Sequence, residues 1–381
     1  MPKKSRKNVG IIGLGIIGAR VAQGLRAAGF QVFVWNRTAK PAPNFLGSPI
    51  EVAEIADIIQ IFVADSQALF HVIDAFGGAL TENHVIVNSS TVGPEATMEA
   101  ARLVRAKGAR FLDAPFTGSK LAAEKQQLAY YIGGDDTTFK KAEPMLKASS
   151  KAIIRCGEIG HAAVLKVATN MITAVTTQTL AEALALVMKA GLSPAAFAAA
   201  IENNACRSGT TDIKLPKMAT GDYEPHFSLK HMFKDVQLAI HMANALDIEV
   251  PATTVTAGVM YGALNHGWAD LDFASVFKLY DGAFPVRKME PAQIDAPKPK
   301  PAEEEASRTE VPTAKPIEKS DAETKPMEVV ADVPRNAKPA GDATPDDAKN
   351  AESAADAGEA DDIPKGKPFN RIRRFFSPTG K

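Results

Sequence analysis

Cysteine, net charge and long apolar runs are what this 381-residue sequence has little of. Two cysteines, Cys156 and Cys206, are too few for a disulfide framework or a zinc site, and no metal is expected. The 44 Lys and Arg residues balance the 44 Asp and Glu residues, so no global positive field favours a nucleic-acid partner. No uninterrupted apolar run of about 18 residues occurs, which predicts no transmembrane segment. These absences favour a cytoplasmic protein.

Short apolar runs alternate with helical patterns from residue 8 to about residue 156. The runs are NVGIIGLG, QVFVWN, IIQIFVA, HVIVNSS, ARFLDAP and LAYYIGG. Gly or Pro stands at the joins, and this alternation is typical of βα units that build a largely parallel sheet. We predict an α/β domain of the doubly wound Rossmann type over residues 1–160.

Long stretches rich in Ala, Leu and Met follow, at helical spacing. The stretch AAVLKVATNMITAVTTQTLAEALALVMKAGL predicts one long helix that ends near Gly191. SPAAFAAAIENN and FKDVQLAIHMANAL continue the pattern, so an all-α domain is expected over residues 161–283. Such a helix would pack poorly if it were exposed on a monomer, which favours a homodimer or homotetramer.

Residues 284–381 are rich in Pro, Ala, Lys, Glu and Asp. This composition buries too little apolar surface to offset the entropy of ordering, so a disordered tail is expected. The final FNRIRRFFSPTGK interleaves Phe with Arg. It is either a short motif for an anionic surface or partner groove, or a frayed end without a role, and the sequence does not identify a partner.

A glycine motif follows the first predicted strand. Gly13, Gly15 and Gly18 form G-x-G-x-x-G at the start of a predicted helix. Such glycines allow a tight turn and a close approach to a pyrophosphate, while the helix N-terminus favours its negative charge. The turn therefore predicts a dinucleotide site. Its expected cofactor-binding residues are Gly13, Leu14, Gly15, Ile16, Ile17 and Gly18.

The end of the second predicted strand indicates which dinucleotide is preferred. NAD-type sites place an acidic residue there, whereas this strand ends in Asn36, Arg37 and Thr38. A guanidinium pairs with a 2′-phosphate, so these three residues predict a preference for NADP(H). NAD(H) remains the alternative if Arg37 is only a solvated loop residue.

Lys166 and Asn170 lie four residues apart in the predicted long helix and therefore share one face. That helix is otherwise dominated by apolar residues. A lysine in this position either extends its ammonium to solvent or takes part in chemistry. The spacing alone leaves both interpretations open.

Over roughly residues 8–280 the chain resembles the β-hydroxyacid dehydrogenases, a family that includes 3-hydroxyisobutyrate dehydrogenase and is related to 6-phosphogluconate dehydrogenase. The resemblance is carried, in order, by the glycine motif, NSSTVGP (88–94), DAPFTGSKLAAEKQQL (113–128), the Lys166 and Asn170 helix, and FSLKHMFKDVQLA (227–239). WNRT, the GSK and AE of the third motif, and DLDFASV (270–276) are most similar to the glyoxylate/succinic semialdehyde reductase branch, which uses NADPH.

The resemblance implies a role for each matched residue. Lys166 would be the catalytic acid/base, and Asn170 would help to hold the substrate. Thr91 would contact the nicotinamide side of the cofactor, with a helix N-cap as the alternative. The remaining implied residues are Thr117, Gly118 and Ser119 for the substrate carboxylate and Lys234 for closing the site against cofactor and substrate. The alternative for Lys234 is a surface pair with a nearby acid.

Three departures from the family pattern leave the substrate open. Asn88 stands at the family's Asp position, Thr117 at its Ser position, and Ala162 at the second glycine of the G-x-G that precedes the lysine. The methyl group of Thr117 would narrow the pocket. None of these changes removes Lys166 or Asn170.

The expected function is NADPH-dependent reduction of a small semialdehyde or 2-oxo acid that carries a carboxylate. Hydride transfer to a carbonyl carbon develops negative charge on oxygen, which the Lys166 ammonium would stabilise and protonate. Three alternatives remain: oxidation of a 3-hydroxy acid, an imine reductase, and a scaffold that binds NADP without turnover. Lys166 argues against an imine reductase, and Lys166 with Asn170 argues against a scaffold.

Overall fold

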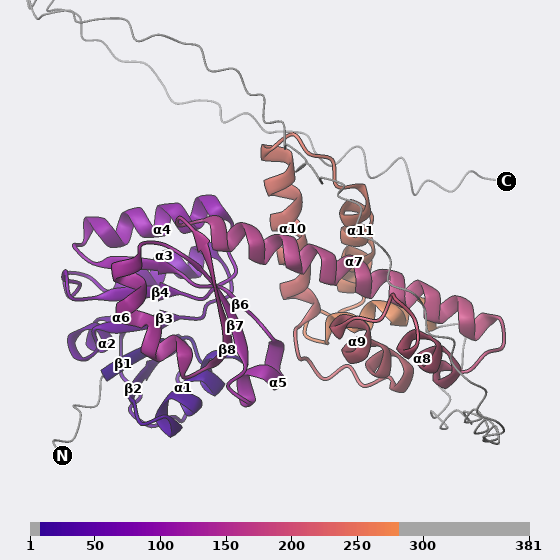
Figure 1. Ribbon diagram of the computed structural model, residues 1–381, viewed down its shortest axis with the longest axis horizontal. Coiled ribbons are helices and arrows are strands. Elements are labelled where there is room, and N and C mark those ends of the chain that lie inside the picture. Colours follow the sequence, from indigo (N-terminus) through magenta and orange to yellow (C-terminus); the bar gives the residue numbers. More distant parts are fainter. Residues whose placement is uncertain (1–7, 282–381) are drawn as a thin grey trace, which may run out of the picture. The chain divides into compact units, whose positions relative to one another are not determined.

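The computed structural model describes residues 8–281. These residues belong to one compact unit, Met1–Ile294, and their element order is labelled in Figure 1. The predicted disorder of residues 284–381 and the predicted motif at the chain end lie outside the described residues.

A mixed sheet forms the first half of this unit. Its strands are β1 (Asn8–Ile12), β2 (Gln31–Trp35), β3 (Ile58–Ile61), β4 (Val85–Asn88), β5 (Arg110–Asp113), β6 (Phe116–Thr117), β7 (Leu128–Gly133) and β8 (Ser150–Gly157). They are ordered β2-β1-β3-β4-β5-β7-β6, and β8 pairs with β7. The first five are parallel, whereas β7 is antiparallel to β5. The Rossmann-type sheet is confirmed, and strand order reverses at β1, where such folds bind ligands.

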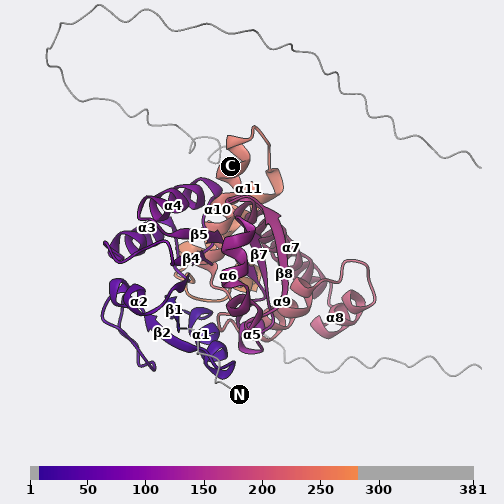
Figure 2. The same cartoon turned by 60° about the vertical axis from the view of Figure 1, so that its left-hand side comes forward.

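Helices cover both faces of this sheet. They are α1 (Gly18–Ala27), α2 (Pro49–Ile55), α3 (Ser66–Ala75), α4 (Pro94–Ala106), α5 (Ser119–Glu124) and α6 (Asp136–Lys147). Because side chains alternate along a strand, Val85 and Val87 of β4 join one core with α1 and α6, while Ile86 joins a second core with α2, α3 and α4. Figure 2 shows α3 and α4 side by side over that second core.

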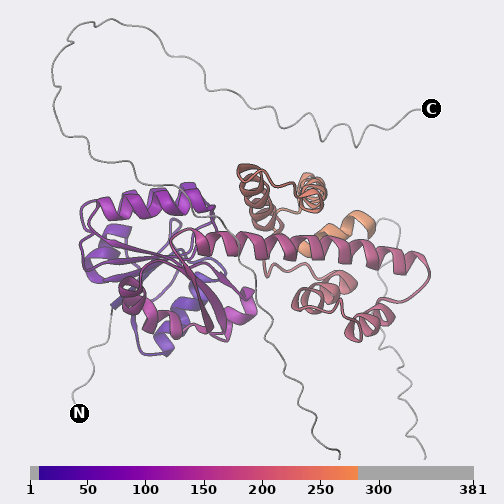
Figure 3. The same cartoon turned by 45° about the horizontal axis from the view of Figure 1, so that its top comes forward.

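The second half is helical, as predicted. Its elements are α7 (His161–Lys189), α8 (Pro194–Glu202), α9 (Gly209–Thr220), α10 (Leu229–Ala245), α11 (Pro251–Asn265), the 3₁₀ helix η1 (Phe273–Phe277) and α12 (Lys278–Asp281). The long helix α7 ends where the sequence indicates, because Gly191 adopts a positive φ of 87° directly after its C-cap. It contacts α10 and α11 on one side and α8 and α9 on the other (Figure 3).

The predicted division into two domains at residue 160 coincides with the change from sheet to helix between Gly157 and His161. Both halves nevertheless belong to the same compact unit, so the division itself stays a prediction.

Helix α7 bears on the prediction that no helix spans a membrane. Within residues 8–281 it is the one helix long and apolar enough to do so, with a mean hydropathy of 1.4 over its best window. Polar residues interrupt that window, which explains why the sequence shows no continuous apolar run. Core helices of soluble proteins meet the same criterion, and α7 packs against α9, α10 and η1. Only 33% of the window is buried, so α7 also presents an exposed apolar face.

Candidate active site

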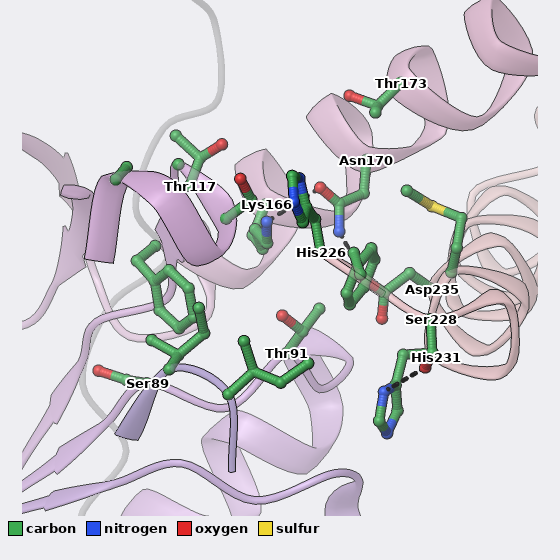
Figure 4. Close-up of a pocket in the computed structure, with 18 of the residues that line it drawn as sticks. Ser89, Thr91, Thr117, Lys166, Asn170, Thr173, His226, Ser228, His231 and Asp235 are labelled. Atoms are coloured by element: carbon green, nitrogen blue, oxygen red, sulfur yellow. Dashed lines mark hydrogen bonds between the residues drawn. The ribbon is translucent and has the colours of Figure 1, made fainter. Parts of the chain in front are cut away.

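A cavity of about 720 Å³ opens where the carboxyl ends of β1, β3 and β4 face α7, α9 and α10. Its sheet side includes residues 15–18, 62–64 and 89–91, and its helical side includes Lys166, Asn170 and Lys234. Figure 4 shows Thr91 and Thr117 in one close-up with Lys166 and Asn170 of α7. The cavity thus joins the glycine turn to the predicted acid/base, although the two lie far apart in sequence.

The glycine turn has the shape that a dinucleotide requires. Gly13 has a φ of 97°, and a Cβ there would lie 2.0 Å from the Phe62 carbonyl oxygen. A Cβ on Gly18 would lie 2.0 Å from the Gly13 carbonyl oxygen. These two glycines are therefore required by packing. A Cβ on Gly15, by contrast, would meet nothing within 4 Å, which leaves open space beside the α1 N-terminus for a pyrophosphate.

The end of β2 is tied to this turn. The backbone N–H of Leu14 donates to Asn36 Oδ1 at 2.8 Å, and Lys40 Nζ donates to the Leu14 carbonyl at 2.9 Å. Arg37 and Thr38 are exposed beside them. Asn36, Arg37 and Thr38 lie outside the cavity lining, at the edge expected for the adenosine ribose. The Lys40 contact was not foreseen, because the chain must fold back before its ammonium reaches the turn.

Lys166 is held inside the cavity by a chain of hydrogen bonds. The residue is only 8% exposed, and its Nζ donates to Asn170 Oδ1 at 2.9 Å. Asn170 Nδ2 then donates to Asp235 Oδ2 at 2.6 Å (Figure 4). Snorkelling to solvent is therefore excluded for Lys166. Its ammonium also lies 5.9 Å from the centroid of the Phe116 ring.

Burial lowers the pKa of the Lys166 ammonium from 10.5 to about 8. The Asp235 carboxylate opposes this shift, and the Lys234 ammonium adds to it. At this pKa the Lys166 side chain is mostly protonated at pH 7, and about half of the side chains have lost the proton at pH 8. It can therefore give and take a proton within the range of physiological pH.

Lys234 bridges the helical half to the sheet half. Its Nζ forms an ion pair with Asp235 Oδ1 at 2.8 Å and donates to the backbone carbonyl of Thr91. Thr91 is not the N-cap of α4, a position that Gly93 occupies. Lys234 pairs with an acid, as the alternative interpretation expected, but the acid is completely buried in the cavity wall rather than on the surface.

The loop that carries Thr91 is fixed by side chains of the NSST motif. Asn88 Oδ1 accepts a hydrogen bond from the Ser90 N–H at 3.1 Å, so the amide supplies the acceptor that the family's aspartate would offer. Ser90 Oγ accepts from the Val63 N–H at 3.0 Å, and Ser89 Oγ donates to the Ala114 carbonyl at 2.8 Å. The departure at position 88 thus leaves the loop anchored.

Thr117, Gly118 and Ser119 line the cavity together. Gly118 has a φ of 127°, and a Cβ there would lie 2.6 Å from the Ala122 Cβ. Ser119 also adopts a positive φ of 56°, which is uncommon for a non-glycine residue. Strained backbone of this kind is often found at ligand sites.

Asp113, at the end of β5, anchors the start of α7. Its side chain is 1% exposed, and its Oδ2 accepts from the N–H groups of Gly160 and Ala163, each at 3.1 Å. Burial raises the pKa of this carboxyl to about 7, while the two backbone hydrogen bonds act against the shift. The anchor lies one turn before Lys166 and connects the sheet directly to the helix that carries it.

Two family models match consecutive parts of the chain. Residues 8–160 match the NAD binding domain of 6-phosphogluconate dehydrogenase, and residues 160–280 match the NAD-binding part of NADP-dependent 3-hydroxyisobutyrate dehydrogenase. Glyoxylate/succinic semialdehyde reductase 1 of Arabidopsis thaliana is 30% identical, over 71% of this chain and 97% of its own length. The chain belongs to the β-hydroxyacid dehydrogenase family.

Further relatives agree with this assignment. The chloroplastic glyoxylate/succinic semialdehyde reductase 2 of A. thaliana is 31% identical, over 72% of this chain and 80% of its own length. The structure of Mycobacterium tuberculosis 3-hydroxyisobutyrate dehydrogenase with L-serine has a TM-score of 0.64 and 27% identity, and the match covers 72% of this chain and 99% of that one. The protein is thus an NAD(P)-dependent dehydrogenase or reductase.

Asp235 is the most important site residue that the sequence analysis missed. Its signal is visible in retrospect, because it lies on the apolar face of α10 with Leu229, Met232 and Val236, all of them buried. A charged residue at such a position needs a partner, just as Lys166 does on α7. Lys214 and His226, which also line the cavity, gave no comparable signal.

Proposed function

We propose that this protein uses NADPH to reduce a small aldehyde that carries a carboxylate, of the glyoxylate or succinic semialdehyde type. The proposal rests mainly on Lys166, whose ammonium is buried in the same cavity as the Gly15–Gly18 turn. The two A. thaliana relatives, named for glyoxylate and succinic semialdehyde, support this choice of substrates.

Lys166 acts as the general acid in this proposal. When bound, the nicotinamide would supply the hydride for the carbonyl carbon, and negative charge would then develop on the carbonyl oxygen. The Lys166 ammonium stabilises that charge and transfers its proton to the oxygen. Asn170 Oδ1 accepts a hydrogen bond from the Lys166 ammonium and thereby orients it. The Asn170 amide is itself oriented by its hydrogen bond to the Asp235 carboxylate.

The same residues support the reverse reaction. Oxidation of a 3-hydroxy acid needs Lys166 as a neutral amine that accepts the hydroxyl proton. Burial has already lowered its pKa to about 8, so the neutral form is accessible at mildly alkaline pH. Direction then depends on the ratio of the two forms of the cofactor.

For the cofactor we propose NADP(H) over NAD(H). No carboxylate follows β2, where a ribose diol would need one, and Arg37 is exposed at that edge. The Lys40 ammonium, held at the Leu14 carbonyl, adds a second positive charge near the turn. Thr91 lines the cavity where the nicotinamide is expected, and Lys234 closes that side through its contact with the Thr91 carbonyl.

For a carboxylate adjacent to the carbonyl, we propose the segment Thr117, Gly118 and Ser119 as its site, completed by Lys234 and Asn170. Gly118 is required there by its φ and by the nearby Ala122 Cβ. The Thr117 and Ser119 hydroxyls supply donors beside the open backbone.

We also propose that the protein assembles into a homodimer or homotetramer through its helical half. Large apolar side chains are exposed there on α7 and α11, among them Leu165, Ile172, Leu186, Val255 and Tyr261. Helices α7 and α11 contact each other, and exposed apolar side chains on neighbouring helices often mark an interface. Light scattering after gel filtration should give at least twice the monomer mass, and a monomer at micromolar concentration would refute assembly. A cytoplasmic location stays a prediction.

The test of the proposed activity is NADPH oxidation by the purified protein with glyoxylate, succinic semialdehyde, tartronate semialdehyde and methylmalonate semialdehyde, beside matched NADH reactions. Turnover of one of the first two, faster with NADPH, supports the proposal. Turnover of only the latter two would move the substrate assignment to the 3-hydroxy acid type.

A further inference from the structure

The helical wall of the cavity carries cationic groups that neither the glycine turn nor the Lys166 network uses. Among the described residues that line the cavity, one, Asp235, is acidic, and four are lysines: Lys151, Lys166, Lys214 and Lys234. Lys166 and Lys234 belong to the proposed reaction centre. Lys214, on α9, does not, and it lines the cavity together with His226.

Lys214 is a buried cation. Its side chain is 6% exposed, its Nζ forms an ion pair with Asp272 Oδ1 at 2.7 Å, and it lies 3.8 Å from the centroid of the Phe273 ring. A buried ammonium costs free energy unless every N–H finds a partner. The ion pair uses one N–H of the ammonium and the Phe273 ring lies nearby, so Lys214, which lines the cavity, keeps donor capacity for a further partner.

Asp272 forms an ion pair with Lys214, and both of its carboxylate oxygens also accept hydrogen bonds from backbone N–H groups. Oδ1 also accepts from the Ala274 N–H at 3.0 Å, and Oδ2 accepts from the N–H groups of His226 and Phe227 at 3.0 and 3.3 Å. These three N–H groups and the ammonium satisfy the Asp272 oxygens together, so Asp272 holds Lys214 at a fixed position in the cavity wall. The same contacts fix the backbone of His226 against η1.

His226 presents an unused polar atom. Its Nδ1 is buried and has no hydrogen-bond partner among the described residues. The imidazole lies in the cavity that Lys166 and Asn170 also line (Figure 4). Gly209 and Thr210, at the positive end of α9, line the cavity beside Lys214. An ammonium, an imidazole and a helix N-terminus thus face the same space.

We propose that Lys214 and His226 bind the carboxylate of a substrate in which two or more methylene groups separate that carboxylate from the reacting aldehyde. This inference rests on the proposed reductase function and adds to it a second anion position. Glyoxylate, whose carboxylate adjoins the carbonyl, uses Thr117–Ser119, and succinic semialdehyde uses Lys214 and His226. Lys214 on α9 and His226, in the segment between α9 and α10, therefore determine the chain length that the enzyme accepts.

The test compares three aldehydes: glyoxylate, succinic semialdehyde and butanal, which has the length of succinic semialdehyde without its charge. The variants are Lys214→Gln, which keeps a donor for Asp272, and His226→Phe, which keeps volume. Lys230→Gln, an exposed α10 lysine paired with Asp270, is the matched control.

In the unaltered protein, kcat/KM should be about tenfold or more higher for succinic semialdehyde than for butanal, as expected for a charge-assisted hydrogen bond to a buried group. Lys214→Gln and His226→Phe should remove most of that advantage, while kcat/KM for glyoxylate changes by less than about threefold. Equal losses for glyoxylate and succinic semialdehyde would overturn the assignment, as would an unaltered protein that does not distinguish succinic semialdehyde from butanal. If Lys214→Gln does not fold, the kinetics of His226→Phe alone test the proposed anion site.

Calorimetry separates this inference from the reductase proposal. The protein saturated with NADP⁺ is titrated with 4-hydroxybutyrate, glycolate and 1-butanol. Binding of 4-hydroxybutyrate that depends on Lys214, in a protein that reduces no aldehyde, would support the anion site and refute the reductase. Turnover of glyoxylate by a protein with equal affinity for 4-hydroxybutyrate and 1-butanol would support the reductase and refute the anion site.

Discussion

Replacing Lys166 by Met removes the proposed acid while keeping a long apolar side chain in its place. Lys166 is buried, and its folded-state pKa lies below its ordinary value, so the charged form costs folding free energy near pH 7. Methionine carries no such cost. We therefore expect Lys166→Met to fold with a Tm close to that of the unaltered protein and to bind NADPH normally, because the glycine turn is unchanged.

The expected loss of activity is large. A positioned general acid contributes about 10²- to 10⁴-fold to a rate, so kcat should fall by that factor while the KM for NADPH stays within about twofold. Lys230→Met is the matched control, because Lys230 is an exposed lysine that pairs with Asp270 away from the cavity. It should leave kcat unchanged.

The pH dependence follows from the same pKa. With a value of about 8, about nine-tenths of the Lys166 side chains are protonated at pH 7 and about one-tenth at pH 9. The rate of reduction should therefore fall about tenfold between those pH values, and the rate of oxidation should rise over the same range. Stopped-flow measurement of NADPH absorbance isolates the chemical step. Activity that survives in Lys166→Met, or a reduction rate that stays level from pH 7 to pH 9, would refute the role assigned to this lysine.

Three further substitutions test neighbouring parts of the site. Arg37→Ala should raise the KM for NADPH about 10- to 100-fold and leave the KM for NADH nearly unchanged. The control is Arg102→Ala, because Arg102 is an exposed arginine of α4 that pairs with Glu99 and does not line the cavity. Equal effects of Arg37→Ala on both cofactors would argue against 2′-phosphate recognition. Asp235→Asn removes the charge that raises the pKa of Lys166, so the alkaline limit of the reduction profile should move to lower pH, and an unmoved limit would contradict that coupling. Asp113 binds its proton more tightly in the folded state, with a pKa of about 7 against 3.8, so its contribution to stability decreases as pH rises from about 4 to 7. Asp113→Asn should flatten that part of the Tm profile, and a profile that keeps its slope would show that the carboxyl is not the cause.

Much of the fold follows from local pattern. The six apolar runs named from the sequence correspond to β1, β2, β3, β4, β5 and β7, because each is short, apolar and bounded by Gly, Pro or polar residues. β6 has only two residues, and no residue of β8 is buried, so neither shows the periodicity that reveals a strand. Their place in the sheet depends on pairing with β7, which is a long-range contact.

The site was predictable where a motif constrains the backbone. Gly13 and Gly18 could be identified because packing leaves no room for a Cβ at either position. Lys166 and Asn170 share a face through helical spacing alone. Asp235 contacts Asn170 across 65 residues of sequence, so that connection appears only when α7 and α10 pack together.

The measurement to make first is NADPH oxidation by the unaltered protein and by Lys166→Met, with glyoxylate and succinic semialdehyde, after NADPH binding has been confirmed for both by fluorescence. We predict turnover of at least one aldehyde by the unaltered protein and a loss of about 10²-fold or more in the variant. NADPH binding by both proteins without turnover of either aldehyde would contradict the reductase assignment and favour a cofactor-binding scaffold.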